Sequence, residues 1–408
     1  MTARTSPLAR LRAAVTGHGR APLPVPADRP IRVLHVVQRY FPELGGLETH
    51  VAEVTKRLAL RSDVEVTILT TDRSGALPER DEVGGVPVIR RRSWPKEQDF
   101  YFSPGIGKVI AQPQWDVIHF QGINTLVPLV GMLAAIRAGK RFVLTFHSGG
   151  HSSAGRTAAR GAQFSVLAPL LRRSAKLIAV SRFEKKRFSA ATGIDPDHFV
   201  VIGNGGALPA VAADVTARRG RMVSSGRLEK YKGHHRAIEA MPLILAQMPD
   251  ADLVVLGAGP YEQALRDLAV ELGVQDSVAI RHLPPADRSA MARELAQSSL
   301  MMALSSYEAH PVGVMEAVAS GLPVLGFDIA GTGDLVEDGL VTGISAESSN
   351  EEIATAALRL LRAQDPSVAR TRPEVDLPTW ERCADGVAGV YQEVVGRTVA
   401  PADRVAGG

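Results

Sequence analysis

Short runs of β-branched residues alternate with helix-length segments along most of this chain, and this alternation limits the folds that the chain can adopt. One series of such runs extends from residues 32–37 to residues 177–180, and a second extends from 221–225 to 323–327. Repeated units of strand, crossover helix and strand predict a parallel, doubly wound sheet. We therefore predict an α/β protein with two Rossmann-like domains that face each other across a cleft.

A segment without apolar periodicity, residues 207–220, separates the two series and is rich in Ala, Val, Asp and Arg. The predicted organisation is a flexible extension at 1–30, a first domain at 31–208, a linker at 209–220, a second domain at 221–376 and a tail at 399–408. Ligands of open α/β sheets bind at the loops that follow the carboxyl ends of the strands. We therefore expect the functional residues in those loops.

The composition excludes several classes of protein. The 408 residues carry 47 Lys and Arg against 43 Asp and Glu, and a net charge of +4 does not indicate a nucleic-acid binder. The single cysteine, Cys383, excludes internal disulfides and cysteine-rich metal sites. The longest apolar run, residues 123–136, is too short to span a bilayer, and residues 1–30 lack the apolar core of a secretion signal. We therefore predict a cytoplasmic protein.

A glycine turn follows the first strand. Gly45 and Gly46 allow a ligand to approach the backbone closely, and the helix that follows directs its N-terminal N–H groups toward it. The alternative is an ordinary tight turn between strand and helix, in which Glu48 only complements the helix dipole.

Two cations flank the start of the first helix in the second series. Arg227 follows the strand at 221–225, and Lys232 precedes the helix that begins near His234. Charge, forked guanidinium donors and the helix dipole together favour a diphosphate. The alternative is that both side chains are solvated surface charges.

Two glutamates lie eight residues apart in the segment 306–324. Pro311 stands where a helix can begin and Gly321 where it must end, so Glu308 falls in the loop and Glu316 inside the helix. Eight residues of helix span roughly 12 Å, which is too far for the two carboxyls to share a proton. They are instead suited to hold hydroxyls at two ends of one extended ligand. A carboxylate among the apolar neighbours of Glu316 is costly unless it is hydrogen-bonded.

Histidines and aromatic residues supply the remaining candidates. His147 and His119 each stand at the end of a predicted strand, although a lone histidine is more often structural. The segment 90–102, which contains Trp94, concentrates aromatic residues and suits either a sugar-binding loop or simple packing. The basic stretch at 164–173 suits either peripheral membrane contact or a solvated helix face.

In their order, these motifs resemble those of the retaining glycosyltransferases of family four, over about residues 31–395. The matching motifs are Gly-Gly-Leu-Glu at 45–48, Gly-Arg-Leu and Lys-Gly within 226–233, Gly-Ala-Gly-Pro at 257–260, and the Glu-x7-Glu pair. The resemblance implies the GT-B architecture, with an acceptor domain at 31–208 and a nucleotide-sugar domain at 221–376. Residues 377–398 resemble the last helix of such enzymes, which returns to the N-terminal domain.

The resemblance also implies roles for individual residues. Glu308 would bind hydroxyls of the transferred sugar and Glu316 those of the ribose, while His147 would approach the sugar and the reacting phosphate. Arg227 and Lys232 would bind the donor diphosphate, and the turn at Gly45 and Gly46 would complete its cradle. The backbone amides of Gly313, Val314 and Met315 would do so as well.

We expect the protein to need no cofactor and no metal ion. No Asp-x-Asp motif occurs in a suitable loop, and two fixed cations can stabilise the departing diphosphate without a metal ion. Transfer with retained anomeric configuration is implied by the family.

Departures from the family pattern concern the acceptor side. His119-Phe-Gln121 replaces the frequent His-x-His, so His119, Gln121, Glu48 and Trp94 are acceptor-side candidates without a defined acceptor. An acceptor glycan, a glycolipid and a small aglycone all remain open. So do two other functions, a nucleotide-sugar epimerase and a non-catalytic nucleotide-sugar binder in a glycan-assembly complex.

Overall fold

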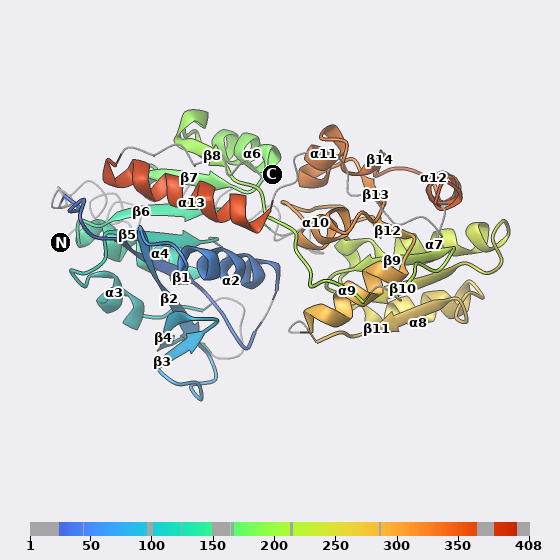
Figure 1. The fold of residues 1–408 in the computed structure, drawn as a ribbon, viewed down its shortest axis with the longest axis horizontal. Coiled ribbons are helices and arrows are strands. Elements are labelled where there is room, and N and C mark those ends of the chain that lie inside the picture. The colour runs from blue at the N-terminus through green and yellow to red at the C-terminus, as the bar shows by residue number, and fades with distance from the viewer. Residues whose placement is uncertain are drawn as a thin grey trace, which may run out of the picture.

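The computed structural model describes residues 24–43, 45–95, 101–123, 125–148, 164, 167–212, 215–284, 287–364 and 379–397. It contains two α/β domains placed side by side, each built on its own sheet (Figure 1). The prediction of two parallel-sheet α/β domains is confirmed. Most of the predicted extension, the loop tip at 96–100 and the tail lie outside the described residues.

The N-terminal domain has an eight-stranded sheet. Its strands are β1 (Ile31–Val37), β2 (Val64–Asp72), β3 (Arg80–Val83), β4 (Val86–Arg92), β5 (Val117–Gln121), β6 (Arg141–Thr145), β7 (Lys176–Ala179) and β8 (Phe199–Val201). They lie in the order β3-β4-β2-β1-β5-β6-β7-β8, and each neighbouring pair is parallel except the β3–β4 hairpin. The strand order reverses direction at β1, so β1 and β5 form the switch point at which such sheets bind ligands.

The C-terminal domain has a six-stranded parallel sheet. Its strands are β9 (Arg221–Ser225), β10 (Asp252–Leu256), β11 (Val278–Arg281), β12 (Leu300–Ala303), β13 (Val324–Phe327) and β14 (Thr342–Ile344). The order β11-β10-β9-β12-β13-β14 places the switch point between β9 and β12. The two cations follow β9 and the two glutamates follow β12, so the topology brings these motifs together.

Helices cover both sheets. They are α2 (Gly46–Leu58), α3 (Gly105–Ile110), α4 (Leu126–Arg137), α6 (Arg182–Thr192), α7 (His234–Leu245), α8 (Glu262–Glu271), α9 (Arg288–Gln297), α10 (Val312–Ala319), α11 (Ala330–Glu337), α12 (Asn350–Arg362) and α13 (Trp380–Val395). Glu308 lies in the loop before α10 and Glu316 lies within α10, as the sequence predicts. The described part of 207–220 contains no helix or strand.

The last helix, α13, leaves the C-terminal domain and packs on the N-terminal sheet (Figure 1). Its buried side chains recur every three or four residues, which gives the helix one apolar face. They are Trp380, Cys383, Ala384, Val387, Ala388, Val390 and Tyr391. Arg57 of α2 also pairs with Glu381 at 2.7 Å. This packing joins the last described helix to the N-terminal domain.

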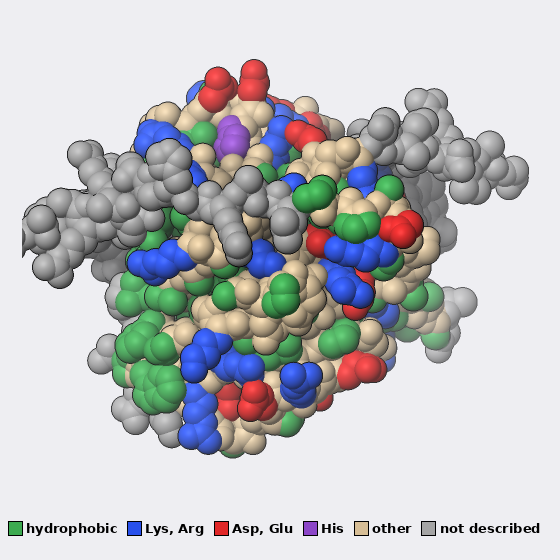
Figure 2. All heavy atoms as spheres, turned by 90° about the vertical axis from the view of Figure 1, so that its left-hand side faces the viewer, with side chains coloured by type: hydrophobic (Ala, Val, Ile, Leu, Met, Phe, Trp, Pro, Cys, Tyr) green, Lys and Arg blue, Asp and Glu red, His purple; other side chains and the backbone are tan. Residues whose placement is uncertain are grey.

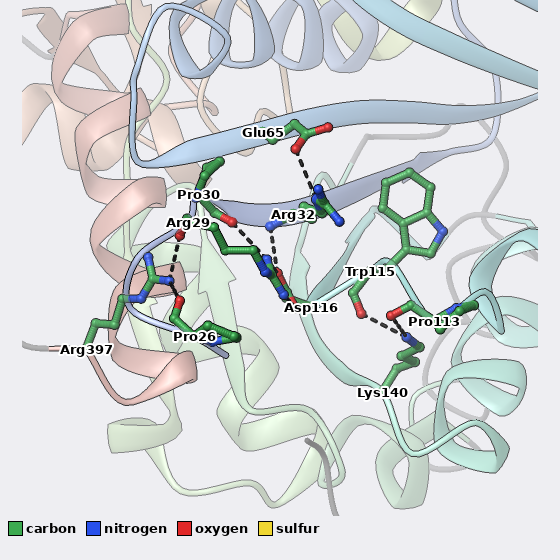
Figure 3. Close-up of polar contacts among 10 residues, drawn as sticks. All are labelled: Pro26, Arg29, Pro30, Arg32, Glu65, Pro113, Trp115, Asp116, Lys140 and Arg397. Carbon is green, nitrogen blue, oxygen red and sulfur yellow. Dashed lines mark hydrogen bonds and ion pairs between the residues drawn. The ribbon is translucent and has the colours of Figure 1, made fainter. Parts of the chain in front are cut away.

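The opposite edge of the N-terminal sheet, where the strands begin, is held by a cluster of charged side chains (Figure 3). Arg29 donates two hydrogen bonds to Asp116, at 2.6 and 2.9 Å, and the backbone N–H of Arg32 donates a third. Arg397, just beyond α13, donates to the carbonyl of Arg29 at 2.8 Å. Burial alone raises the pKa of Asp116, but the hydrogen bonds and charges of Arg29 and Arg32 together outweigh it and the pKa is lowered. This edge stabilises the fold and lies away from the predicted site.

The basic stretch at 164–173 does not present an apolar face to the surface. Leu167, Leu170 and Leu171 are buried in the core of the N-terminal domain, and Arg172 donates to the carbonyl of Thr192 at 2.7 Å. These leucines therefore belong to the core of the domain, and peripheral membrane contact by this stretch stays a prediction.

No helix within the described residues is long and apolar enough to cross a membrane. Figure 2 shows the end of the N-terminal domain that points away from the C-terminal domain. Lys and Arg side chains are scattered there among apolar and acidic ones.

Candidate active site

Loops that follow the carboxyl ends of strands in both domains meet at one point. Ser148, after β6, and Tyr307, after β12, share a hydrogen bond of 2.6 Å between their hydroxyls. Each is the chain neighbour of a predicted catalytic residue, His147 and Glu308. The fold therefore brings together two residues that are 161 positions apart in the sequence.

Glu308 forms an ion pair with Lys232. Lys232 Nζ lies 2.6 Å from Glu308 Oε1, and the Ser305 hydroxyl donates to the same oxygen at 2.9 Å. Burial by itself lowers the pKa of Lys232, but the charge of Glu308, its hydrogen bond and the influence of Tyr231 together outweigh burial and the pKa is raised. Lys232 therefore stays charged, and the structure places a fixed cation beside a fixed carboxylate.

The loop that carries Lys232 depends on a glycine. Gly233 has φ +72°, and a Cβ atom there would lie 1.7 Å from the carbonyl oxygen of Leu304. Only glycine combines the left-handed conformation with this close approach. The junction thus holds the start of α7 directly against the end of β12.

Arg227 is anchored through its backbone while its guanidinium remains accessible. His234 Nε2 lies 3.3 Å from the Arg227 carbonyl, and the other ring nitrogen lies 2.8 Å from the Ser224 hydroxyl. Burial lowers the pKa of His234 to about 4, so the ring is neutral at pH 7. The Arg227 side chain is 58% exposed and pairs with Glu229 at 2.9 Å. A solvent-facing guanidinium on a fixed loop suits the binding of an anionic ligand.

Glu316 is 4% exposed and forms an ion pair with Arg288, the first residue of α9. Burial raises the pKa of Glu316, and the charge of Arg288 opposes part of that rise. Arg288 was not predicted, although its place at the start of a helix was a usable signal. The buried carboxylate of Glu316 therefore has a charged partner that offsets its lost hydration.

The predicted backbone donors of α10 are only partly suited to bind phosphate. Gly313 and Val314 lie in the first turn, where N–H groups have no partner within the helix. The Met315 amide instead donates to the Pro311 carbonyl at 3.1 Å, and the Met315 side chain is buried in the core. Met315 is therefore not available as the third phosphate donor that the resemblance implies.

His147 lies at the end of β6 beside Gln121 and His50. Its Nε2 lies 2.9 Å from Gln121 Oε1, and its ring centroid lies 4.6 Å from that of His50. Burial, and then the charge of His50, lower the pKa of His147 well below its usual value. A neutral imidazole therefore stands next to the point where the two domains meet.

The glycine turn is shaped by a buried carboxylate. Gly45 caps α2 without a side-chain bond, and a Cβ atom on it would lie 2.8 Å from Glu48 Oε2. Glu48 is fully buried and pairs with Arg39 at 2.7 Å. The placement of Glu48 on the acceptor side is therefore a correction: it lies beneath the turn and supports it.

His119 and Gln121 need the same correction. Both are fully buried within β5, and His119 bonds to Tyr391 and Thr145 instead of facing a ligand. Gln121 lies behind His147. Trp94, at 47% exposed, is the acceptor-side candidate that the structure leaves at the surface, where it bridges to Phe102.

Two further residues were not predicted to have a role in the site. Glu184 is fully buried and accepts from the amide of Ser148 at 2.8 Å, which fixes the loop that follows His147. Asn204 bonds to His50 at 2.8 Å and to the carbonyl of His310 at 2.8 Å. It therefore joins the two domains. These contacts join residues that are far apart in the sequence, so no local sequence pattern predicts them.

Among the described residues, no group of three or more His, Cys, Asp or Glu side chains could hold a metal ion.

Comparison with known proteins gives two family matches in the same order as the two domains. Residues 44–206 match the model of Glycosyltransferase Family 4, and residues 216–373 match that of Glycosyl transferases group 1. A GDP-mannose:cellobiosyl-diphosphopolyprenol alpha-mannosyltransferase from Komagataeibacter xylinus is 24% identical, covering 93% of this chain and 98% of that protein. A GDP-mannose-dependent alpha-(1-6)-phosphatidylinositol monomannoside mannosyltransferase from Mycobacterium tuberculosis is 25% identical, over 83% of this chain and 91% of its own length.

Solved structures share the fold. A sucrose-phosphate synthase from Thermosynechococcus elongatus superposes with a TM-score of 0.70 at 18% identity, covering 90% of this chain and 99% of its own. Anabaena HepE, solved with UDP-glucose, gives a TM-score of 0.64 at 20% identity, covering 90% of this chain and 98% of its own.

Proposed function

The chain belongs to glycosyltransferase family four and has the GT-B architecture, and from this premise we propose that it transfers a hexose with retention and without a metal ion. The donor is a nucleotide-sugar and the acceptor provides a hydroxyl. The bond between the acceptor oxygen and the anomeric carbon forms as the bond to the diphosphate breaks. The diphosphate leaves with the electron pair, and the hydroxyl proton passes to it.

The observation that carries this proposal is the bond between Ser148 and Tyr307. It places the loop of His147 next to the loop of Glu308, and Glu308 is in turn bonded to Lys232. A neutral imidazole, a carboxylate and a cation thereby converge from two domains. A sugar phosphate offers hydroxyls to the carboxylate and negative charge to the cation.

The charges of the site support catalysis without a metal ion. Negative charge grows on the diphosphate as it leaves, and fixed cations in a partly dry site stabilise it effectively. Lys232 is 18% exposed and held by Glu308, while Arg227 stands open at the edge. Glu316, in the middle of α10, would accept bonds from the ribose hydroxyls once Arg288 shares or releases it.

We propose GDP-mannose as the donor and a lipid-linked saccharide or inositol as the acceptor. The names of the two curated relatives support this choice, since both specify GDP-mannose and a lipid-linked acceptor. The exposed aromatic pair Trp94 and Phe102 gives the acceptor domain an apolar surface suited to a sugar face or a lipid-proximal group.

The test begins with released nucleotide. GDP-mannose, GDP-glucose, UDP-glucose and ADP-glucose are each incubated with the protein, with and without EDTA and with cellobiosyl-diphosphopolyprenol or phosphatidylinositol. We expect release from GDP-mannose that EDTA does not reduce, and an α-linked product by NMR. A β-linked product would contradict retention, and loss of activity in EDTA would contradict metal independence.

A pair of variants tests the site itself. Glu308→Gln keeps the shape but removes the charge paired with Lys232, so we expect at least a hundredfold loss of transfer. Glu262→Gln, in the exposed ion pair with Arg266 on α8, is the matched control and should retain full activity. A folded, fully active Glu308→Gln protein would contradict the role of Glu308.

Two alternatives predict other results. An epimerase would convert the free donor without an acceptor. A non-catalytic nucleotide-sugar binder would raise its melting temperature with one donor and release no nucleotide. The convergence of Lys232, Glu308 and His147 favours transfer over both.

A further inference from the structure

A continuous chain of hydrogen bonds runs through the core of the N-terminal domain and ends at His147. It starts at Thr145 and passes through His119, Tyr391, His35 and Gln121. The successive distances are 2.7 Å (Thr145–His119), 2.6 Å (His119–Tyr391), 2.7 Å (Tyr391–His35), 3.2 Å (His35–Gln121) and 2.9 Å (Gln121–His147). Every member before His147 is fully buried. The chain connects β1, β5 and β6 with the last helix, α13.

The hydrogen bonds all run in one direction, with each donor pointing away from His147. Gln121 turns its carbonyl oxygen toward His147 Nε2 and its amide nitrogen toward His35 Nδ1. His147 therefore donates through Nε2, and His35 accepts at Nδ1 and donates through Nε2 to the Tyr391 oxygen. Tyr391 then donates to His119 Nδ1, and His119 donates from Nε2 to Thr145. One tautomer of each histidine satisfies every bond.

This arrangement requires neutral imidazoles, because a protonated ring has two donors and no acceptor. Burial, followed by the charge of His50, lowers the pKa of His35 to about 3. Burial, followed by the charge of His35, lowers that of His119 well below its usual value. Both rings are therefore neutral at any pH at which the enzyme would work.

We propose that Gln121, His35 and Tyr391 are positioning residues that fix the ring orientation and the tautomer of His147. The inference rests on the proposed function only in that His147 approaches the donor sugar. The catalytic imidazole is thereby oriented by α13, a helix that joins the N-terminal domain from the far end of the sequence.

A purely structural account does not explain why the core holds these groups. An apolar core of the same volume is generally at least as stable as a buried polar network, and its members are costly if any is left unsatisfied. The network ends on His147, which stands beside the point where the domains meet. Its second neighbour, His50, packs against the same ring and bonds to Asn204, so the imidazole is held from two sides.

The first test reads the tautomer directly and does not require activity. Long-range ¹H–¹⁵N NMR spectra of the ¹⁵N-histidine-labelled protein distinguish the Nε2–H and Nδ1–H forms, and His147→Gln identifies the His147 signals. We expect the Nε2–H form in the unaltered protein and a mixture of both forms in Gln121→Leu and Tyr391→Phe. A single unchanged tautomer in both variants would overturn the proposal even if no donor were turned over.

The second test is kinetic. Tyr391→Phe removes only the hydroxyl that joins His35 to His119, so we expect about a tenfold fall in kcat with the donor KM within twofold. Gln121→Glu should instead raise the pH of the acidic limb of the rate profile, because a carboxylate beside His147 favours its protonated form. Val387→Ala loosens the packing of the same helix and removes no member of the hydrogen-bond network. It is the matched control and should leave kcat within twofold.

Two results would contradict the proposal: unchanged kcat in a folded Tyr391→Phe protein, or an equal loss of kcat in Val387→Ala. If the unaltered protein transfers no sugar at all, the proposed function fails while the NMR experiment still decides the role of the chain.

Discussion

Glu316 shows how a single residue can combine a cost in stability with a role in binding. A carboxylate at 4% exposure loses most of its hydration, and Arg288 supplies the compensating charge from a neighbouring helix. The Arg288 side chain is itself one third exposed, so it can move while Glu316 cannot. In the absence of ligand, Arg288 therefore opposes the rise that burial causes in the pKa of Glu316.

Replacing Arg288 with Gln should weaken donor binding. Glu316 would lose the charge that opposes the rise in its pKa, and a protonated carboxyl accepts hydroxyl bonds less well. We expect the donor KM to rise about tenfold with kcat changed less than threefold, and stability to fall by about 1–3 kcal/mol. Steady-state kinetics and urea unfolding measure the two effects.

The control is Arg266→Gln, which removes an exposed pairing on α8 and should change neither quantity. A donor KM that stays within twofold in Arg288→Gln would show that Glu316 does not depend on this partner.

The buried His50 allows a second prediction at the scale of a residue, which concerns how the stability of the fold depends on pH. Burial lowers its pKa to about 4, whereas an unfolded histidine titrates near 6.5. Between these values the unfolded chain binds a proton that the folded chain does not, so stability falls as the pH falls. The stability contributed by the neutral ring is complete above pH 6.5 and is lost progressively toward pH 4.

His50→Gln should remove this dependence for one proton, because glutamine does not titrate and its amide can still bond to Asn204. Between pH 6 and 5, the slope of unfolding free energy against pH should decrease by about 1.4 kcal/mol per pH unit. Urea unfolding at several pH values measures it, and His282→Gln, at an exposed position, is the matched control. An unchanged slope would mean that His50 is not buried in its neutral form in solution.

At the scale of elements, most of the strands could be predicted because parallel strands buried on both faces form continuous apolar runs. The hairpin β3–β4 and the edge strands β8 and β14 were missed. Arg80–Val83 is mostly exposed and charged, and Thr342–Ile344 is short and half-buried, so neither has an apolar pattern. Their pairing depends on neighbouring strands, and sequence periodicity does not report neighbours.

The candidate site was predictable to the extent that each motif occupies one loop. Arg227, Lys232 and Glu308 are found together because their loops follow β9 and β12 at the switch point. Arg288 and the chain behind His147 could not be predicted, because their partners come from other elements. Burial also reversed two expectations, since His119 and Glu48 look like ligand-binding residues in sequence and are enclosed in the fold.

The junction between β9 and α7 is an element whose geometry can be tested by one methyl group. In Gly233→Ala, the new Cβ would lie 1.7 Å from the Leu304 carbonyl oxygen, in a left-handed conformation. We expect a loss of about 3 kcal/mol in stability because both backbone strain and steric overlap must be relieved. Thermal or urea unfolding of the purified protein measures it.

Gly273→Ala separates the two causes. Gly273 also has a positive φ, of +67°, but no atom lies within 4 Å of the position of its Cβ atom. Only the conformational cost of about 1–2 kcal/mol applies there. Equal losses in the two variants would show that the contact with Leu304 relaxes without cost.

At the scale of the whole molecule, contacts between the domains hold them in the arrangement that forms the site, and three of them are polar bonds between side chains or loops. Asn204 bonds to the carbonyl of His310 near the linker, and Ser148 bonds to Tyr307 between the catalytic loops. Arg182 of α6 pairs with Glu337 and Asp338 of α11 at the rim. The sequence predicted that two domains would face each other, but their relative placement depends on contacts of this kind between residues far apart in the sequence.

The contact between Ser148 and Tyr307 should therefore influence activity through domain placement. We expect Ser148→Ala and Tyr307→Phe each to lower kcat/KM for the donor about fivefold, and the double variant to lower it no further. Either single change already removes the bond, so a double-mutant cycle should report their coupling. Ser306→Ala is the control, since the Ser306 hydroxyl donates to the Tyr231 carbonyl within its own domain and should be dispensable.

Small-angle scattering should show a larger radius of gyration in both single variants. Additive losses would place the two hydroxyls in separate roles, and unchanged scattering would show that the remaining contacts between the domains suffice to hold them together.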